Sequence, residues 1–440
     1  MIVHLTSLGC ARNQIDSEIM LGRLNQVGAL FTDTPGDAEV IIVNTCSFIE
    51  SAADESIDTI LELAAHKNEG RCRRLIVTGC LPERYRQEIT RAIPEVDVFL
   101  GTGAFDRIVA AVQGHLDTAK CLLPDPDSLS PSGAGVSRER SNRWMAYVKS
   151  AEGCSRQCTY CIIPRLRGRR KSRSIEDVVA ESRQLIQTGV RELVLVSQET
   201  TAYGKDLKPP ADLARLLTAL AALPDGSGTD AFWIRFLYGH PQSIDDRLMN
   251  AVAQNANICS YFDIPIQHAS RSILKKMGRR YGPDDLRLML ERIRRLMPEA
   301  ALRTTVIVGF PGETDADFDE LLSFVESERF NHLGCFVYSD SEDLPSHGLP
   351  DHVPTATAQE RYRILMERQQ EISAARNRKY KDQKVAVLVE EHQENGLYTG
   401  RTEFQAPEVD GVTYIHADRL QTGCFAKLMI TDTLEYDLVG

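Results

Sequence analysis

The sequence contains Glu152-Gly-Cys-Ser-Arg-Gln-Cys-Thr-Tyr-Cys161, which places Cys154, Cys158 and Cys161 in a C-x3-C-x2-C spacing. Soft thiolate ligands favour an iron–sulfur cluster or zinc. Three thiolates leave one iron of a 4Fe–4S cube open, and the amine and carboxylate of an amino acid can chelate that iron. The alternatives are a zinc site that lacks its fourth ligand and a group of thiols without metal.

Apolar runs and amphipathic stretches alternate on both sides of this loop. The candidate strands are Trp144–Lys149, Glu192–Ser197, Phe232–Tyr238, Tyr261–Ile266, Arg303–Val308 and Leu333–Tyr338. The helix-like segments between them include Ile175–Thr188, Asp212–Ala222, Pro283–Leu296 and Asp315–Glu328. Six βα units are too few for an eight-fold barrel and predict a partial one over residues 142–382. The cysteine loop follows the first strand, at the face where barrel active sites form.

Three further cysteines share a position in the preceding segment, residues 1–123. The apolar runs of this segment are Ile2–Leu5, Val40–Val43, Leu75–Val77 and Val96–Leu100. Because helix-like stretches separate these runs, they predict an open parallel sheet. Cys10, Cys46 and Cys80 each lie two or more residues beyond one of the strands, so they can converge at one sheet edge on a second cluster with a free iron. The alternative is three small buried thiols, which are common in cores.

The remaining segments predict a linker, a helix and a small β domain. Residues 124–141 are rich in Pro, Ser and Gly, which is typical of a linker. Thr357 to about Lys381 has the pattern of one helix, with Thr357 and Glu360 as a capping box. Residues 383–440 carry short β-type runs broken by Gly and Pro, and they predict a small antiparallel barrel. The expected fold class is therefore α/β with a C-terminal β-barrel.

Composition sets the broad class of protein. The 440 residues carry 51 Lys and Arg against 62 Asp and Glu, a net charge of −11, and the acidity argues against a generic nucleic-acid coat protein. No run approaches the roughly 18 apolar residues of a membrane span, and the start lacks signal-peptide features, so we expect a cytoplasmic protein. Cysteines there serve metal binding or catalysis more often than disulfides. The cysteines without a positional pattern are Cys72, Cys121, Cys259, Cys335 and Cys424, which we expect to be structural.

Taken together, these features resemble the radical S-adenosylmethionine enzymes, and within them the methylthiotransferases. The similarity covers nearly the whole chain. It is carried by Leu5-Thr-Ser-Leu-Gly-Cys-Ala-Arg-Asn-Gln-Ile-Asp-Ser-Glu18, Glu152-Gly-Cys through Arg165-Leu-Arg-Gly168, Thr305-Val-Ile-Val-Gly-Phe-Pro-Gly-Glu-Thr314 and Phe404-Gln-Ala-Pro-Glu-Val-Asp-Gly411. The last segment resembles the branch that modifies a ribosomal-protein aspartate. The turn Asp340–Leu349 departs from the Glu-Glu-Gly-Thr-like sequence of the family.

The resemblance implies two 4Fe–4S clusters and S-adenosylmethionine as cofactors. The implied cluster ligands and catalytic residues are Cys154, Cys158 and Cys161 for one cluster and Cys10, Cys46 and Cys80 for the other. The first cluster would cleave S-adenosylmethionine to a 5′-deoxyadenosyl radical, and the second would carry a sulfur that a second S-adenosylmethionine methylates. The implied substrate is an aspartate β-carbon of small-subunit ribosomal protein twelve. An electron donor and a sulfur source are further implied partners.

Candidate contacts to S-adenosylmethionine lie at strand ends of the expected partial barrel. Tyr160 lies inside the cysteine loop and could offer its backbone to the adenine. Gln198 and Glu199 follow the second strand and could bind ribose hydroxyls or the amine. A turn after the fifth strand lets backbone approach the ligand, and it consists of Gly309, Phe310, Pro311 and Gly312. An ordinary βα turn is the alternative for each, and His240 and His268 at strand ends favour a structural role.

Residues 165–173 read Arg-Leu-Arg-Gly-Arg-Arg-Lys-Ser-Arg, with six positive charges and no negative one. Because this run directly follows the cysteine loop, we expect it at the mouth of the active site. Two interpretations remain open. In the first, the run recognises an anionic group, which is a substrate carboxylate or ribosomal RNA. In the second, it is a solvated basic loop before a helix.

The substrate class is the main open question. Residues 383–440 hold four basic and ten acidic residues, a balance that repels a phosphate backbone and attracts a basic protein. We therefore favour a basic ribosomal protein, with nucleic acid at most a secondary contact through ribosomal RNA. The competing functions are a transfer-RNA methylthiotransferase, a non-catalytic iron–sulfur electron carrier or sensor, and a zinc-bound assembly factor.

Overall fold

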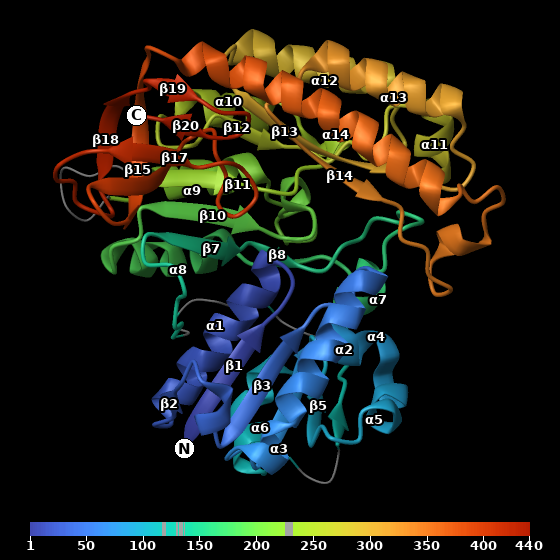
Figure 1. The fold of residues 1–440 in the computed structure, drawn as a ribbon, viewed down its shortest axis with the longest axis vertical. Coiled ribbons are helices and arrows are strands. Elements are labelled where there is room, and N and C mark those ends of the chain that lie inside the picture. The colour runs from blue at the N-terminus through green and yellow to red at the C-terminus, as the bar shows by residue number, and fades with distance from the viewer. Residues whose placement is uncertain (117–119, 129–130, 132–134, 136, 225–231) are drawn as a thin grey trace.

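The computed structural model describes residues 1–116, 120–128, 131, 135, 137–224 and 232–440. Figure 1 shows an N-terminal α/β domain, a larger array of strands and helices above it, and a C-terminal sheet packed against that array. Part of the predicted linker 124–141 lies outside the described residues. Within the described part of the chain, no helix combines the length and the hydropathy needed to cross a bilayer.

The N-terminal domain is built on one sheet in the order β2-β1-β3-β4-β5-β6, in which every pairing is parallel. Its strands are β1 (Ile2–Ser7), β2 (Leu30–Phe31), β3 (Val40–Thr45), β4 (Arg74–Gly79), β5 (Val98–Leu100) and β6 (Cys121–Leu122). Its α-helices are α1 (Ala11–Gln26), α2 (Glu50–Ala64), α3 (His66–Glu69), α4 (Cys80–Tyr85), α5 (Ile89–Ala92) and α6 (Ile108–Gln113). The predicted open parallel sheet is confirmed, because alternate residues of β3 enter two separate cores: Ile41 one and Ile42 the other.

The central array has the six predicted parallel strands: β7 (Met145–Lys149), β10 (Glu192–Val196), β11 (Trp233–Phe236), β12 (Tyr261–Asp263), β13 (Ala301–Val308) and β14 (His332–Val337). They form two three-stranded sheets, β11-β10-β7 and β12-β13-β14, linked by a parallel bridge between Ile234 and Ile258. A short hairpin pairs β8 (Ala151–Glu152) with β9 (Lys171–Ser172) around the cysteine loop. The partial barrel expected from the sequence is confirmed.

Helices cover the outside of this partial barrel. They are α8 (Ile175–Gln187), α9 (Leu213–Ala221), α10 (Asp246–Gln254), α11 (Arg271–Lys276), α12 (Pro283–Leu296), α13 (Asp315–Glu328) and α14 (Thr355–Asn377). The short helix α7 (Ile163–Arg167) instead packs against the N-terminal domain, where Leu166 lies in one small core with Cys80. The sequence analysis missed α10, although Asp245 caps it by accepting the Leu248 N–H. The predicted capping box at Thr357 and Glu360 is wrong, because α14 begins two residues earlier, directly after Pro354.

The strands of the partial barrel are apolar on both faces, for two different reasons. Ala146 and Val148 of β7 point outward into the core shared with the surrounding helices. Met145 and Tyr147 point inward, where they pack against Ala11 of α1 and other residues of the N-terminal domain. Helix α1 therefore fills part of the concave face, and this contact fixes the N-terminal domain on the barrel.

The C-terminal sheet has the order β18-β15-β16-β17-β20-β19 and remains open. Its strands are β15 (Lys384–His392), β16 (Leu397–Thr402), β17 (Thr413–His416), β18 (Phe425–Met429), β19 (Asp432–Thr433) and β20 (Leu438–Val439). The α/β fold class with a C-terminal β domain is confirmed. The sheet is mixed and curled, however, because β20 inserts parallel to β17 instead of completing an antiparallel barrel.

Buried charges hold this sheet at the amino ends of the barrel strands. Glu192, the first residue of β10, accepts hydrogen bonds from Arg235 (2.7 Å) and from Arg401 of β16 (2.5 Å). Burial alone would raise the pKa of Glu192, but the charges of Arg401 and Arg235 outweigh it and lower that pKa. Nearby, the Tyr261 hydroxyl donates to Asp410 at 2.6 Å. The C-terminal sheet thus docks opposite the cysteine loop, which follows the carboxyl end of β7.

Replacing Glu192 tests this docking. Glu192→Gln leaves the buried Arg235 without a counter-charge and Arg401 with Glu390 alone, and it should destabilise the protein by ~3–5 kcal/mol, seen as a lower thermal unfolding midpoint. Glu326→Gln is the matched control, because its partner Arg368 is 46% exposed and such pairs contribute at most about 1 kcal/mol. Equal shifts in the two variants would contradict the docking role of Glu192.

Candidate functional site

Three neighbouring strands carry the N-terminal cysteines. Cys10 follows β1 and caps α1, Cys46 follows β3, and Cys80 follows β4 as the first residue of α4. Since β1, β3 and β4 are adjacent and parallel, their carboxyl ends lie at one edge of the sheet. Burial raises the pKa of Cys80, the charge of Arg167 opposes that rise, and the nearby Cys46 and Cys10 add to it. The structure therefore brings together these three residues, here called the N-terminal trio.

Two glycines allow these loops to approach each other. Gly9 has φ +96°, and a Cβ there would lie 2.8 Å from Cys46 Cβ and 3.2 Å from its Sγ. Gly79 has φ +98°, and a Cβ there would lie 2.5 Å from Asn44 Oδ1. Each glycine directly precedes a cysteine of the N-terminal trio. Because a side chain at position 9 or 79 would collide with the neighbouring loop, close packing of the cysteine loops requires glycine at both positions.

The three thiols of the N-terminal trio have different acidities. Burial raises the pKa of Cys10, but the charges of Arg12 and Arg167 and backbone N–H groups outweigh burial and lower it. Burial raises the pKa of Cys46, and it raises that of Cys80 to about 11. Cys10 is therefore the thiol of the trio that ionises most readily.

The second group of cysteines lies in the loop between β8 and α7. The Cys154 N–H donates to Gly168 O at 3.0 Å, and the Cys161 N–H donates to Cys158 O at 3.1 Å. Burial raises the pKa of Cys161 to about 12, and the nearby Cys158 and Cys154 add to the shift. Their C-x3-C-x2-C spacing in one short loop keeps the three thiols, here called the barrel trio, close together.

Both trios have the chemistry of cluster ligands. Within the described ranges, the chain has no group of three or more His, Cys, Asp or Glu arranged to hold a single metal ion. A 4Fe–4S cube takes one thiolate at each of three irons, so its ligands need not meet at one point. The charges of Arg12 and Arg167 favour the thiolate of Cys10, whereas burial outweighs the charge of Arg279 and raises the pKa of Cys161. The residues present fit two such clusters.

A buried charge network joins the two trios. Lys149 of β7 donates to Asp16 of α1 at 2.6 Å and to Glu152 at 2.7 Å. Arg167 of α7 donates to Asp16 at 2.9 Å and also to Asn13, and its Nη2 lies 3.8 Å from Cys80 Sγ. This network, here called the junction network, connects the residues beside Cys154 with those beside Cys10 and Cys80.

The basic run 165–173 divides between two environments, which neither sequence interpretation anticipated. Arg167 belongs to the junction network, and Arg173 is buried against Glu181 and Asp177. Arg165 and Arg169 are exposed. The two buried arginines hold the fold together, so only part of the run is available to an outside anion.

The turn 340–349 lies against both trios. Asp343 accepts a bidentate hydrogen bond from Arg84 of α4, with the shorter distance at 2.8 Å. Leu344 packs with Cys80 and Ile162 in one small core. The Ser346 N–H donates to Thr159 O inside the cysteine loop at 3.0 Å. The turn thus fixes the position of the barrel trio relative to α4.

Tyr160 and the turn after β13 lie side by side. The Tyr160 and Phe310 rings meet edge to face, with centroids 6.3 Å apart. Gly309 and Gly312 have positive φ, and a Cβ would lie 2.4 Å from Ala358 Cβ at the first and 2.0 Å from Lys276 Nζ at the second. Pro311 is buried. The protein's own packing therefore accounts for both glycines.

Gln198 and Glu199 differ in how fully they are paired. Gln198 donates to Glu152 Oε1 at 2.7 Å, while its own Oε1 is buried and has no hydrogen-bond partner among the described residues. Glu199 accepts from Arg156 at 2.7 Å and from Ser243 at 3.0 Å. Gln198 thus has a free acceptor beside the barrel trio, whereas Glu199 is committed to the protein.

The two strand-end histidines have structural partners. His268 Nδ1 accepts the Ser270 N–H at 2.9 Å, and His240 Nδ1 accepts the Gln242 N–H at 3.3 Å. Burial lowers the pKa of His240 to about 2. These contacts agree with the structural role expected for both.

Two arginines that the sequence analysis did not single out lie beside the trios. Arg279 donates to the Tyr160 hydroxyl and stands 5.8 Å from that ring centroid. Arg12 donates to Ser197 O at 2.9 Å and stands 4.6 Å from the Tyr238 ring centroid. For neither arginine does the described part of the structure place a carboxylate within ion-pair distance. Their sequence signal is weak, because single arginines are common.

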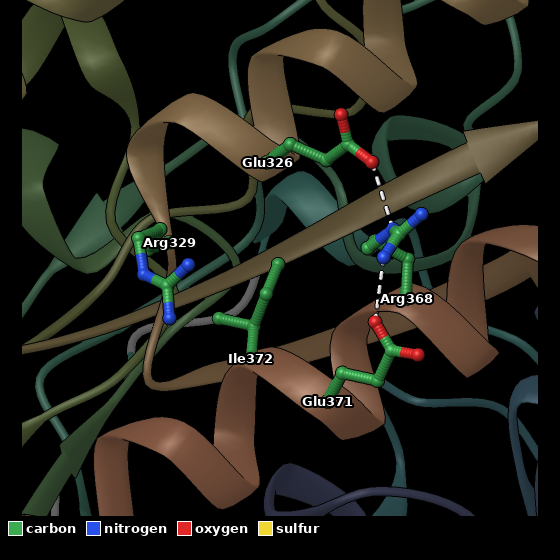
Figure 2. A pocket seen from close by; sticks show the side chains of 5 residues that line it. All are labelled: Glu326, Arg329, Arg368, Glu371 and Ile372. Carbon is green, nitrogen blue, oxygen red and sulfur yellow. Dashed lines mark hydrogen bonds and ion pairs between the residues drawn. The ribbon is translucent and has the colours of Figure 1, made fainter.

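A hollow of about 670 Å³ opens where the N-terminal domain meets the carboxyl ends of β13 and β14. Its lining includes Glu50, Asp54, Gly309, Tyr338, Asp340 and His352. A smaller hollow of about 290 Å³ lies between α13 and α14, where Arg368 pairs with Glu326 and Glu371 (Figure 2). Because only the larger one borders the predicted cofactor turn, it is the better candidate for an approach to the site.

Comparison with known proteins agrees with this geometry. The uncharacterized protein family UPF0004 matches residues 2–101, the Radical SAM superfamily matches residues 148–325, and the TRAM domain matches residues 383–440. Among solved structures, the radical S-adenosylmethionine methyltransferase TsrM from Kitasatospora setae is 16% identical with a TM-score of 0.56, covering 79% of this chain and 75% of its own. That similarity shows the fold alone. The chain is a radical S-adenosylmethionine enzyme with a TRAM domain, and the superfamily implies S-adenosylmethionine and a 4Fe–4S cluster as cofactors.

Full-length relatives give the narrower assignment. The ribosomal protein uS12 methylthiotransferase RimO of Desulfosudis oleivorans is 52% identical over 100% of this chain and 99% of its own. The proteins of the same name from Geobacter sulfurreducens and Clostridioides difficile are 45% and 44% identical, each over 100% of this chain and 98% of theirs. The chain belongs to this family of radical S-adenosylmethionine methylthiotransferases, as its resemblance indicated.

The acidities within the N-terminal trio can be measured on the metal-free protein. The rate at which iodoacetamide labels Cys10 should reach half its limit at a pH below the ordinary thiol pKa. The labelling rate of Cys80 should reach half its limit near pH 11. Arg12→Met should move the Cys10 midpoint to higher pH and leave that of Cys80 in place. Peptide mass spectrometry after timed labelling gives both profiles, and coincident midpoints would contradict the assigned electrostatics.

Proposed function

We propose that this protein adds a methylthio group to the β-carbon of an aspartate in ribosomal protein uS12, with the barrel trio and the N-terminal trio each holding a 4Fe–4S cluster. The observation that carries the proposal is the pair of thiol trios joined by the junction network. The name shared by the full-length relatives supports the substrate. When bound, the clusters and S-adenosylmethionine supply hydrogen abstraction from an unactivated carbon and a methylated sulfur that takes the hydrogen's place.

The chain's own residues position S-adenosylmethionine beside the barrel trio. Tyr160 and Phe310 provide an apolar surface next to the cysteine loop, which keeps water from the reacting carbon. Arg279 offers a charge for the carboxylate of the amino-acid part, because the described residues place no carboxylate of the protein beside it. The free Oε1 of Gln198 is an acceptor for an amine or hydroxyl. Glu199 serves instead to hold Arg156 in the loop.

A macromolecular substrate suits the distribution of charge. The hollow at the carboxyl ends of β13 and β14 carries the acidic side chains Glu50, Asp54 and Asp340, which complement a basic protein segment. In the C-terminal sheet, Glu408, Asp410 and Arg401 pair with the partial barrel, and Glu390 pairs with Arg401. Seven acidic and three basic residues remain in 383–440, so its acidic excess persists. Because this sheet lies at the opposite ends of the strands from the cysteine loop, only a large partner can contact both.

The substrate test separates the two methylthiotransferase functions. The reconstituted protein is incubated with S-adenosylmethionine, sulfide, a reductant and either uS12 or transfer RNA. We expect a methylthio mass increase on an aspartate-containing peptide of uS12 and none on RNA, because the acidic surfaces favour a basic protein. A methylthiolated nucleoside with unmodified uS12 would establish the transfer-RNA function instead.

Separate replacement of the trios tests their roles. The intact reconstituted protein should bind about eight irons, and replacement of Cys154, Cys158 and Cys161 by Ala should leave about half and abolish S-adenosylmethionine cleavage. Replacement of Cys10, Cys46 and Cys80 by Ala should leave cleavage intact and stop sulfur insertion.

Each alternative predicts a different result. Methylthiolation by the variant without the N-terminal trio would refute the role of that trio. Failure of the intact reduced protein to cleave S-adenosylmethionine would favour an electron carrier or sensor. Zinc without iron in the purified protein would favour an assembly factor.

A further inference from the structure

Arg12 is partly buried and, unlike the arginines that hold the fold together, has no carboxylate partner among the described residues. The arginines that pair with buried carboxylates are Arg138, Arg167, Arg173, Arg235, Arg361 and Arg401. For Arg12, the described residues supply the Ser197 carbonyl, the Tyr238 ring and the nearby Cys10 thiol, but no carboxylate within ion-pair distance. Because a guanidinium forms its strongest hydrogen bonds with a carboxylate, an anionic ligand would be favoured beside this partly buried group.

The guanidinium of Arg12 reaches from the N-terminal domain to the partial barrel. Arg12 lies two residues after Cys10 in α1, yet its contacts are Ser197 and Tyr238, which follow β10 and β11. Ser197 is followed by Gln198, which bonds to Glu152, two residues before Cys154. Arg12 therefore stands between the N-terminal trio and the barrel trio, where the proposed reaction needs its substrate.

Tyr238 holds its ring against Arg12 in a costly backbone conformation. Its φ is +63°, a left-handed value that is uncommon for an aromatic residue. Asp263 accepts the Tyr238 N–H at 2.8 Å, and the Tyr238 carbonyl accepts the Thr200 N–H at 3.0 Å. With the ring on one side and the Ser197 carbonyl on one nitrogen, the other N–H groups of Arg12 remain for a bidentate carboxylate.

We propose that Arg12 binds the side-chain carboxylate of the aspartate that receives the methylthio group, and that it distinguishes aspartate from asparagine. The inference rests on the proposed function and adds the residue that selects the amino acid. The β-carbon of aspartate is bonded directly to the carboxylate carbon. A carboxylate held by Arg12 therefore keeps the reacting carbon between the two trios.

Equilibrium binding tests this role without turnover. The reconstituted enzyme is titrated with uS12 and with uS12 in which the target aspartate is replaced by asparagine. The unmodified enzyme should bind the aspartate form about ten- to a hundred-fold more tightly, because a hydrogen-bonded charge pair is lost with asparagine. Arg12→Met should bind both forms with nearly equal affinity, and Arg12→Lys should recover part of the difference.

Arg23→Met is the matched control. Arg23 lies on the same helix, is also partly buried, and likewise donates to a backbone carbonyl, that of Asp106. This variant should keep the full preference for aspartate. Iron content and the electron paramagnetic resonance spectrum should be the same in Arg12→Met as in the unmodified enzyme.

The possible results are distinguishable. If Arg12→Met keeps the unmodified preference for aspartate, the proposal is wrong. If it loses the iron of the N-terminal trio, Arg12 serves the cluster and the proposal is also wrong. If the unmodified enzyme binds neither form of uS12, the proposed substrate itself is wrong. Loss of the preference with clusters intact supports the proposal.

Discussion

The structure depends on four buried charges between the N-terminal domain and the partial barrel. Two are cations, Lys149 and Arg167, and two are anions, Asp16 and Glu152. None of these side chains is more than 9% exposed. Burial alone lowers the pKa of Lys149, yet its carboxylate neighbours Asp16 and Glu152 outweigh burial and raise it. Charges removed from water in this way are tolerated only when each has a partner. One partner comes from α1 and three from the barrel, so neither domain satisfies the network alone.

The junction network also determines how the two thiol trios face each other. Asp16 lies in the same helix that Cys10 caps, Glu152 lies two residues before Cys154, and Arg167 approaches Cys80 Sγ. Each charged pair therefore restrains a cysteine loop of one domain against the other. Because the restraint comes from side chains of the protein, the arrangement of the trios is organised before a cluster binds. Such preorganisation suits a reaction in which a carbon and a sulfur must meet in a fixed geometry.

Much of the fold could be predicted from the sequence, for identifiable reasons. Strands such as β3 and β10 are buried on both faces and therefore appear as uninterrupted apolar runs. The repeated placement of Cys10, Cys46 and Cys80 after such runs indicated a shared sheet edge. The parallel insertion of β20 beside β17 was not predictable, because its two residues carry no pattern of their own.

The site was less accessible to sequence reasoning, because its polar contacts join distant residues. Asp16 and Lys149 are 133 positions apart, and Arg12 and Ser197 are 185 apart. No local periodicity marks such pairs. In the basic run 165–173, the charges were visible, but their division between burial and exposure follows from carboxylates elsewhere in the chain.

The central claim is that the two trios each hold a cluster and face one another across the junction network. Electron paramagnetic resonance of the anaerobically reconstituted and reduced full-length protein tests it most directly. The account predicts two 4Fe–4S signals with a spin–spin interaction that disappears when either trio is replaced by alanine. A spectrum equal to the sum of the two single-cluster variants, or the signal of one cluster only, would contradict it.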